Sequence, residues 1–278
     1  MDDMHEVRVS SFSELIERLY TDSWMAPLCR FRSNLAFRGM SDASHGLETK
    51  LHRLGRTPGA VESHLLRNFR KYAESEPGRD DSVWSWLALA QHHGLPTRLL
   101  DFTYSPLVAM HFVVDDLSDF NVDGVIWCVD FVKTNNVLPE RLKAILAEEG
   151  SNAFTVEMLS RVAGNLYDLD RSGPDPHVLF FEPPSLDQRI VNQFALFAMM
   201  SNPEARLDQW LRRRPDLGFR IIVSASLKWE LRDKLDQANI SERVLFPGLD
   251  GLSRWLKRYY TTRSRQERVG QKTVKIAR

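Results

Sequence analysis

Ionisable side chains gather in the segment AQHHGLPTRLLDFTYSP, residues 90–106, among apolar residues and turn formers. Arg98 and Asp101 stand next to leucines and a phenylalanine, so we expect burial to remove much of the water around both charges. Because a buried charge without a partner costs several kcal/mol, the two should pair with each other or with other charged groups, of which Arg38 and Arg189 are the obvious candidates. This predicts either a structural salt bridge or an anion-binding pocket in which Asp101 orients an arginine.

The adjacent histidines His92 and His93 do not have the spacing of metal ligands. Neighbouring residues on a helix point about 100° apart, and no cysteine or suitably spaced carboxylate follows in the sequence to complete a site. We therefore expect no metal centre. The chain also lacks a Walker loop, a Gly-x-Ser-x-Gly elbow, a His-Glu-x-x-His helix and a dinucleotide glycine fingerprint, so these common enzyme classes are not indicated.

A third group of polar residues lies in FFEPPSLDQRIVNQFALF, residues 180–197. Arg189 and Gln193 are four positions apart, which places them on one face if a short helix forms here. Gln193 comes directly before an apolar strand. Its amide can either cap backbone groups at this junction or face a ligand.

The elements that must position these residues are read from periodicity and turn signals. An early strand is expected to end at Arg38, because Gly39 after it suits a turn that only glycine adopts cheaply. Apolar runs predict buried strands at 123–131, 177–183, 194–200 and 218–226, and periodic runs predict helices at 11–20, 59–72, 139–149, 153–165, 204–213 and 227–238. The mixed order favours an α+β fold.

Two further helices should enclose the histidine segment. Residues 81–94 read as a helix with Gly94 as its left-handed cap, and Ser105 is the expected N-cap of the next helix. Residues 95–104 are therefore interpreted as a segment that crosses between two helices. The cluster of Gly, Pro and Asp at 170–176 predicts a loop.

Composition sets the general class of the protein. The 278 residues are 43% hydrophobic, enough for a substantial core, and 37 basic residues balance 37 acidic ones. This charge balance does not favour nucleic acid or an anionic membrane as a binding partner. The basic stretch at 67–71 and the basic tail leave nucleic-acid binding as a minor alternative. Two cysteines and no signal peptide predict a cytoplasmic protein, and no apolar run approaches the roughly 20 residues of a membrane span.

Taken together, the polar stretches resemble the FRG domain family, which is named for its Phe-Arg-Gly motif. The matching stretches are LAFRGMSD at 35–42, LALAQHHGLPTRLLDFTYSPLVAMHFV at 87–113, DQRIVNQFALF at 187–197 and ERVLFPGLDGLSRWL at 242–256. The resemblance implies an FRG domain at 30–262, which leaves an N-terminal helical extension at 1–29. The basic and weakly apolar composition of the last 16 residues predicts a flexible tail at 263–278.

A weaker resemblance connects the chain to ADP-ribosyltransferases. It implies a mixed, mostly antiparallel split sheet with flanking helices, and NAD as the substrate. Arg38 would contact the phosphates or ribose of NAD, and Gln193 or Glu182 would take the third catalytic position. The expected substrate-binding residues are Phe37, Gly39, His93, Arg98, Asp101, Thr103, Ser105 and Arg189.

Two functions of different classes follow from these resemblances. The first is an NAD-consuming enzyme that acts as a toxin or defence effector, with a protein or nucleic-acid acceptor. Loss of nicotinamide leaves an oxocarbenium-like ribose, so such a site needs anchored phosphates and a group whose contact strengthens as positive charge develops. The second is a non-catalytic module that binds NAD, another nucleotide or a partner in the same pocket.

Overall fold

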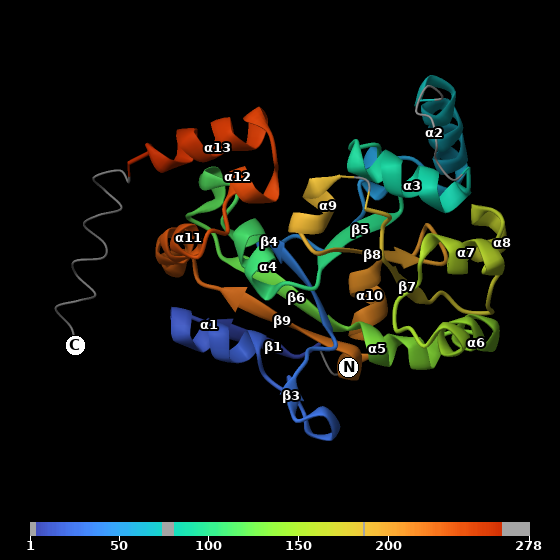
Figure 1. Cartoon of the computed structure of the whole chain (residues 1–278), viewed down its shortest axis with the longest axis horizontal. Helices are drawn as coiled ribbons and strands as arrows, with labels where there is room; N and C mark the ends of the chain where they lie inside the picture. The colour runs from blue at the N-terminus through green and yellow to red at the C-terminus, as the bar shows by residue number, and fades with distance from the viewer. Residues whose placement is uncertain (1–3, 74–80, 186, 263–278) are drawn as a thin grey trace.

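The computed structural model describes residues 4–73, 81–185 and 187–262 and has an α+β fold (Figure 1). Its main sheet has seven strands in the order β1-β9-β6-β4-β5-β8-β7, and a separate two-stranded sheet pairs β2 with β3. The strands are β1 Glu6–Val9, β2 Trp24–Met25, β3 Arg30–Phe31, β4 Leu35–Met40, β5 Leu99–Thr103, β6 Gly124–Asp130, β7 Val178–Phe181, β8 Ala195–Met200 and β9 Gly218–Val223. In the main sheet β1 pairs with β9 in parallel and the other neighbouring pairs are antiparallel. The expected α+β, mostly antiparallel fold is thus confirmed.

Helices cover both faces of the main sheet. They are α1 Phe12–Leu19, α2 Pro58–Ala73, α3 Val83–His92, α4 Pro106–Val113, α5 Phe131–Thr134, α6 Glu140–Glu149, α7 Val156–Val162, α8 Leu166–Asp170, α9 Gln188–Asn192, α10 Leu207–Arg212, α11 Lys228–Gln237, α12 Glu242–Leu245 and α13 Leu249–Tyr259. On one face, α1, α4 and α11 pack against β4, β6 and β9, while α3, α6 and α7 pack against β5, β7 and β8. Residues of α5 and α10 pack on the opposite face. One face therefore carries two separate helix groups that meet above β4 and β5.

The junction of β4 with β5, which we call the seam, is the weakest joint of the sheet. Phe37 pairs with Thr103 there, and no second register pair joins these two strands within the described residues. By contrast, six residue pairs join β4 to β6 and five join β5 to β8. The seven strands therefore form one continuous sheet whose two parts are joined at the seam by a single register pair.

The glycine of the Phe-Arg-Gly motif has a different role from the predicted one. β4 does not end at Arg38 but continues to Met40, and Gly39 does not adopt a left-handed backbone. Instead α4 crosses directly over it. A Cβ atom at Gly39 would lie 1.8 Å from the backbone oxygen of Ala109 in α4. Glycine is needed here because two backbones approach closely, not because the chain turns.

The crossing segment between α3 and α4 also needs a correction. Residues 99–103 form β5, a strand inside the main sheet, rather than a simple connection between helices. The flanking signals are confirmed, since Gly94 has φ +83° after α3 and the Ser105 hydroxyl accepts a hydrogen bond from the Val108 amide at the start of α4. The segment is thus capped as expected but lies in the core.

The N-terminal region contributes more than the expected helix. Ser11 caps α1 as its sequence indicates, but residues before it form β1, which was not predicted and which adds an edge strand beside β9. The other predicted strands and helices are present with ends shifted by a few residues. The predicted flexible tail at 263–278 lies outside the described residues, and the boundaries 1–29 and 30–262 stay predictions.

Candidate functional site

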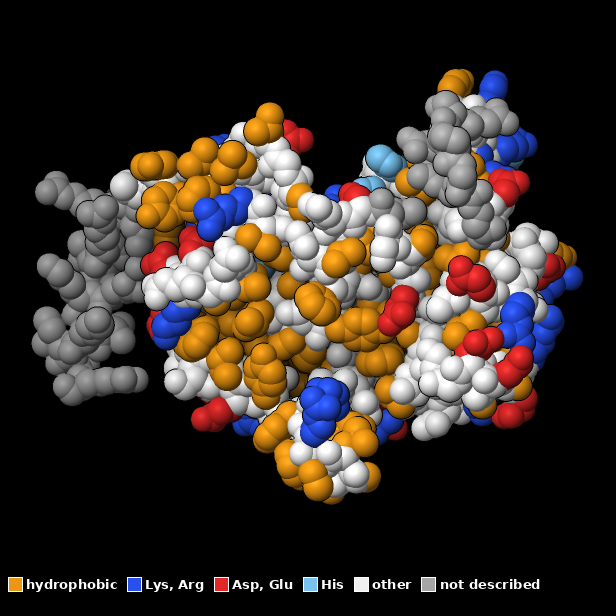
Figure 2. All heavy atoms as spheres, in the orientation of Figure 1, with side chains coloured by type: hydrophobic (Ala, Val, Ile, Leu, Met, Phe, Trp, Pro, Cys, Tyr) orange, Lys and Arg blue, Asp and Glu red, His pale blue; other side chains and the backbone are white. Residues whose placement is uncertain are grey.

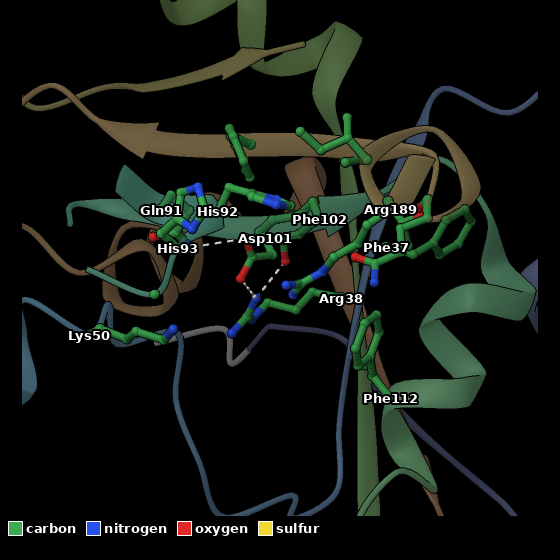
Figure 3. A pocket seen from close by; sticks show the side chains of 17 residues that line it. Phe37, Arg38, Lys50, Gln91, His92, His93, Asp101, Phe102, Phe112 and Arg189 are labelled. Carbon is green, nitrogen blue, oxygen red and sulfur yellow. Dashed lines mark hydrogen bonds and ion pairs between the residues drawn. The ribbon is translucent and has the colours of Figure 1, made fainter. Parts of the chain in front are cut away.

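A pocket of about 600 Å³ opens at the seam, between the two helix groups (Figure 3). We call it the seam pocket. Its walls come from β4, β5, the C-terminal end of α3, α4, α9 and the start of β8. Eight of the eleven residues predicted for the site line it, namely Phe37, Arg38, Gly39, His93, Asp101, Thr103, Arg189 and Gln193. Arg98, Ser105 and Glu182 do not line it.

Arg38 and Asp101 are the central charged pair of the pocket. The Arg38 Nη1 donates a hydrogen bond of 2.5 Å to the backbone oxygen of Asp101 and lies 3.9 Å from its carboxylate Oδ2 (Figure 3). Burial lowers the pKa of the Arg38 guanidinium, and the Asp101 charge partly offsets this. The guanidinium nevertheless stays charged, because arginine does not lose its proton in proteins. It therefore joins the two halves of the sheet across the seam and places a positive charge in the pocket.

Gln91, which the sequence interpretation did not select, orients the Asp101 carboxylate. Its Nε2 donates to Asp101 Oδ1 at 2.9 Å, and its own Oε1 accepts a hydrogen bond of 2.6 Å from the Thr97 hydroxyl. The amide is thereby fixed in one orientation. The Asp101 side chain is 58% exposed, so its carboxylate is held in place yet open to a ligand.

Two further cations, Lys50 and Arg189, line the same pocket. In Figure 3 they approach the space beside Arg38 from opposite sides of the view. Neither makes an ion pair with a carboxylate in the part of the chain that the structure describes; Arg189 instead stacks over the Phe246 ring at 5.0 Å. Three cations thus surround one lining carboxylate, which is a surplus of positive charge suited to an anionic ligand.

His92 connects α3 to α9 at the rim of the pocket. Its Nε2 lies 2.8 Å from Asp187 Oδ2, and the same aspartate caps α9 by accepting a hydrogen bond from the Ile190 amide. Burial lowers the pKa of His92, although Asp187 acts against this. The imidazole is therefore neutral at pH 7, and it positions the helix that carries Arg189.

Arg98 is not part of the pocket and pairs with other charged groups, not with Asp101, whose partner is Arg38. Its guanidinium is buried on the other side of β5, where Nη2 donates to Glu62 at 2.6 Å and Nη1 donates to Asp170 at 2.6 Å. Both the Arg98 and Glu62 side chains are almost fully buried. Of the two interpretations, the structural salt bridge holds for this arginine.

The residues expected beside the scissile bond also have structural partners. The Thr103 hydroxyl donates to the backbone oxygen of Gln193 at 2.7 Å, and the Gln193 Nε2 donates to the backbone oxygen of Leu245 at 2.9 Å. The Gln193 amide group therefore caps α12, although its side chain also lines the pocket. Glu182 lies outside the pocket and accepts a hydrogen bond from the Tyr104 hydroxyl, and their contact together with burial raises the pKa of that phenol.

Sequence reasoning missed several lining residues, among them Lys50, Gln91 and Phe112. Gln91 lies within the polar segment 90–106, and its place on the last turn of α3 was a weak indication that it could face the pocket. Lys50 stands in an irregular segment, where no periodicity shows which way a side chain points. Phe112 lies in the apolar helix α4, whose sequence predicts that its side chains are buried in the core.

The elements around the seam coincide with a known domain. Residues 33–121 match the FRG domain model. The chain contains an FRG domain. The matched segment includes β4, α2, α3, β5 and α4, so the FRG domain supplies both strands of the seam. No match was found among curated proteins or solved structures.

Two classes of feature are not found in the described residues. No group of three or more His, Cys, Asp or Glu side chains is arranged to hold a metal ion. No helix in the same residues has the length and apolar character needed to cross a membrane.

Proposed function

We propose that the protein binds NAD in the seam pocket and cleaves the bond between its ribose and nicotinamide. The observation that carries this proposal is the charge of the pocket, where Arg38, Lys50 and Arg189 surround the single lining carboxylate of Asp101. A pocket of about 600 Å³ lies within the range of roughly 300–1,000 Å³ that small-molecule sites occupy. The arginines and the lysine match the diphosphate of NAD, whose oxygens accept charge-assisted hydrogen bonds.

One ring system of NAD also finds a suitable surface. Phe112 lines the pocket and is partly exposed, whereas the other lining phenylalanines, Phe37, Phe102 and Phe197, are buried. Apolar walls with a few oriented polar groups are typical of sites for small molecules. The pocket thus supports a ligand that has both a planar ring and phosphates.

Asp101 takes the role of the catalytic carboxylate in this proposal. Its fixed and exposed carboxylate can stabilise the positive charge that develops on the ribose as the glycosidic bond breaks. In hydrolysis, water forms the new bond to C1′, the electrons of the old bond stay on the nicotinamide nitrogen, and one proton is released. A nucleophile of a protein or nucleic acid in place of water would give ADP-ribosylation, and an enzyme of either kind would act as a toxin or defence effector.

The test is an incubation of the pure protein with NAD, followed by NMR detection of free nicotinamide. Wild type is expected to release nicotinamide. Lys50→Ala should raise KM about tenfold, because it removes one charge-assisted contact, and Asp101→Asn should lower kcat about 100-fold, because it removes the charge that stabilises the transition state.

Arg38→Ala should abolish turnover, provided that circular dichroism shows an intact fold. Arg56→Ala, which removes an exposed arginine outside the pocket, is the matched control and should leave turnover unchanged. Nicotinamide release that is equal in the wild type, Lys50→Ala and Asp101→Asn proteins would contradict the assignment of the seam pocket.

A second candidate function is a non-catalytic binding module. It is favoured by the positions of the two residues expected at the third catalytic position. The Gln193 side chain donates a hydrogen bond to the backbone oxygen of Leu245, and Glu182 lies outside the pocket. Neither residue is therefore free to act on a ribose. This candidate predicts saturable shifts of the NAD signals, weakened by Lys50→Ala, without nicotinamide release.

A further inference from the structure

A serine and a histidine contact each other in the connection between α8 and β7, where the sequence predicted a loop. The Ser172 hydroxyl lies 3.2 Å from Nε2 of His177. At one end of this connection the Ser172 amide donates to the backbone oxygen of Leu169 at 3.0 Å. At the other end the His177 amide donates to the Ser201 hydroxyl at 3.1 Å. The backbone thus holds the two side chains beside each other.

A hydrogen bond to the backbone fixes the proton of the His177 ring. Nδ1 lies 3.1 Å from the backbone oxygen of Asp175, and because a carbonyl oxygen can only accept, Nδ1 carries the proton. Burial lowers the pKa of His177, so the ring is neutral at pH 7. Its Nε2 therefore offers a lone pair to the Ser172 hydroxyl, whose proton has a second acceptor in the Leu169 oxygen at 2.7 Å. This tautomer is the one that can take a proton from a serine nucleophile.

Ser172 lines a pocket of about 450 Å³ between α6, α7 and α8, which we call the arginine pocket. The three helices lie at the right of Figure 1, where Figure 2 shows basic and acidic side chains mixed on the surface. Among the described residues, none lines both this pocket and the seam pocket. His177 is only 3% exposed and does not line the pocket, so a ligand reaches the serine and not the histidine.

The arginine pocket has a surplus of positive charge. Its charged lining residues are Arg141, Arg161, Arg171 and Asp168. Arg161 is neutralised by Glu148 at 2.6 Å and Glu149 at 2.5 Å. In the part of the chain that the structure describes, Arg141 and Arg171 make no ion pair; Arg141 donates to a backbone oxygen, and Arg171 stacks over a tyrosine ring. Two unpaired arginines and one carboxylate suit a ligand with an anionic group.

We propose that Ser172 is the nucleophile and His177 the base of a second site, which hydrolyses carboxylic esters that bear an anionic group. The Ser172 oxygen bonds to the carbonyl carbon while its proton passes to Nε2 of His177. The Gly173 amide, which has no acceptor within the described residues, is available to the resulting oxyanion. The carbon–oxygen bond to the alcohol then breaks, and the alcohol leaves with the proton. Water repeats both steps on the acyl-serine, which releases the acid and restores the serine hydroxyl.

Covalent labelling of the full chain with a fluorophosphonate tests the nucleophile. We expect Ser172 to form a phosphonate ester with loss of fluoride, located by tandem mass spectrometry of the tryptic peptide 172–189. Ser160 is the internal control, because it lines the same pocket but its hydroxyl donates to the backbone oxygen of Val156. His177→Gln can still hydrogen-bond to the serine but cannot take its proton, so labelling should slow at least about 100-fold. An unlabelled Ser172, or equal labelling of Ser160, overturns the proposal.

The release of acetate from para-acetoxybenzoate, followed by NMR, tests the reaction and its substrate class. The wild-type kcat/KM should exceed that for the neutral methyl ester of the same compound about tenfold, because the carboxylate adds a charge-assisted hydrogen bond. Arg171→Ala should remove this preference. Ser172→Ala should lower kcat/KM at least about 100-fold, whereas Ser253→Ala, at an exposed serine of α13, is the matched control and should leave it unchanged.

Circular dichroism checks that each variant keeps the wild-type fold. Acetate release that is equal in the wild type and Ser172→Ala proteins would show that the serine does not react. Equal wild-type rates with the charged and the neutral ester would show that the arginines do not select the substrate. Either result overturns the proposal, and neither depends on whether the seam pocket cleaves NAD.

Discussion

The buried Arg98 and the half-buried Arg38 differ in how much stability depends on their ion pairs. Arg98 is enclosed by Glu62 and Asp170, while Arg38 bonds chiefly to a backbone oxygen and its acidic neighbour Asp101 is exposed. Removing one member of a buried pair leaves an uncompensated charge in the core. Removing an exposed carboxylate leaves a group that water can still reach.

Arg98→Met should therefore lower the free energy of unfolding by about 3–5 kcal/mol, because it leaves Glu62 buried and unpaired. Asp101→Asn should lower it by less than about 1 kcal/mol, as expected for an exposed pair. Urea unfolding of the two variants beside the wild type measures both values. Equal losses of stability would mean that Asp101 is as structural as Arg98.

The sequence was enough to predict that Arg98 would be buried among apolar residues, but not which carboxylates would form its ion pairs. The leucines beside Arg98 showed that it would be desolvated, since that information is local. Its partners Glu62 and Asp170 are 36 and 72 positions away, and only the packing of α2 and α8 brings them together. The same holds for Lys50, whose place in the pocket depends on the tertiary fold.

At the scale of elements, the crossing of α4 over β4 requires a glycine at position 39, which has no Cβ atom. Gly39→Ala would place a Cβ atom against the backbone oxygen of Ala109, where neither partner can rotate away. We expect a loss of at least about 2 kcal/mol in the free energy of unfolding, as in other overpacked cores. Thermal unfolding measures it. Gly150→Ala is the matched control, with open space around it and φ +61°, and should cost only about 1 kcal/mol.

Helix ends were predictable because their signals are local, as the Ser11 and Ser105 caps show. β5 was interpreted as a connection because it has only five residues and follows a turn, and no local signal separates such a strand from a loop. β1 was missed because an edge strand of four residues has little periodicity of its own. Its partner β9 lies more than 200 residues later in the chain.

At the scale of the whole molecule, buried histidines should make the protein sensitive to mild acid. Burial lowers the pKa values of His92, His111 and His177 below the ordinary value of 6.5. The unfolded chain therefore binds these protons more readily than the folded one. Their contribution to stability is complete above pH 6.5 and is lost as the pH falls from 6.5 through the folded pKa values.

Urea unfolding at about pH 7.5 and about pH 5.5 should show a lower midpoint in acid, before most carboxylates titrate. His111→Asn should reduce this difference, because its amide oxygen can still accept the hydrogen bond from Arg232 but cannot titrate. An unchanged midpoint between the two pH values would contradict the assignment.

The seam has an evolutionary consequence. Arg38 closes the joint between β4 and β5 with its own side chain, and the same guanidinium faces the pocket. A substitution at this position changes the stability of the sheet and the chemistry of the pocket in one step. Under the proposed function, a substitution of Arg38 would thus have to preserve both the fold and the binding of the ligand.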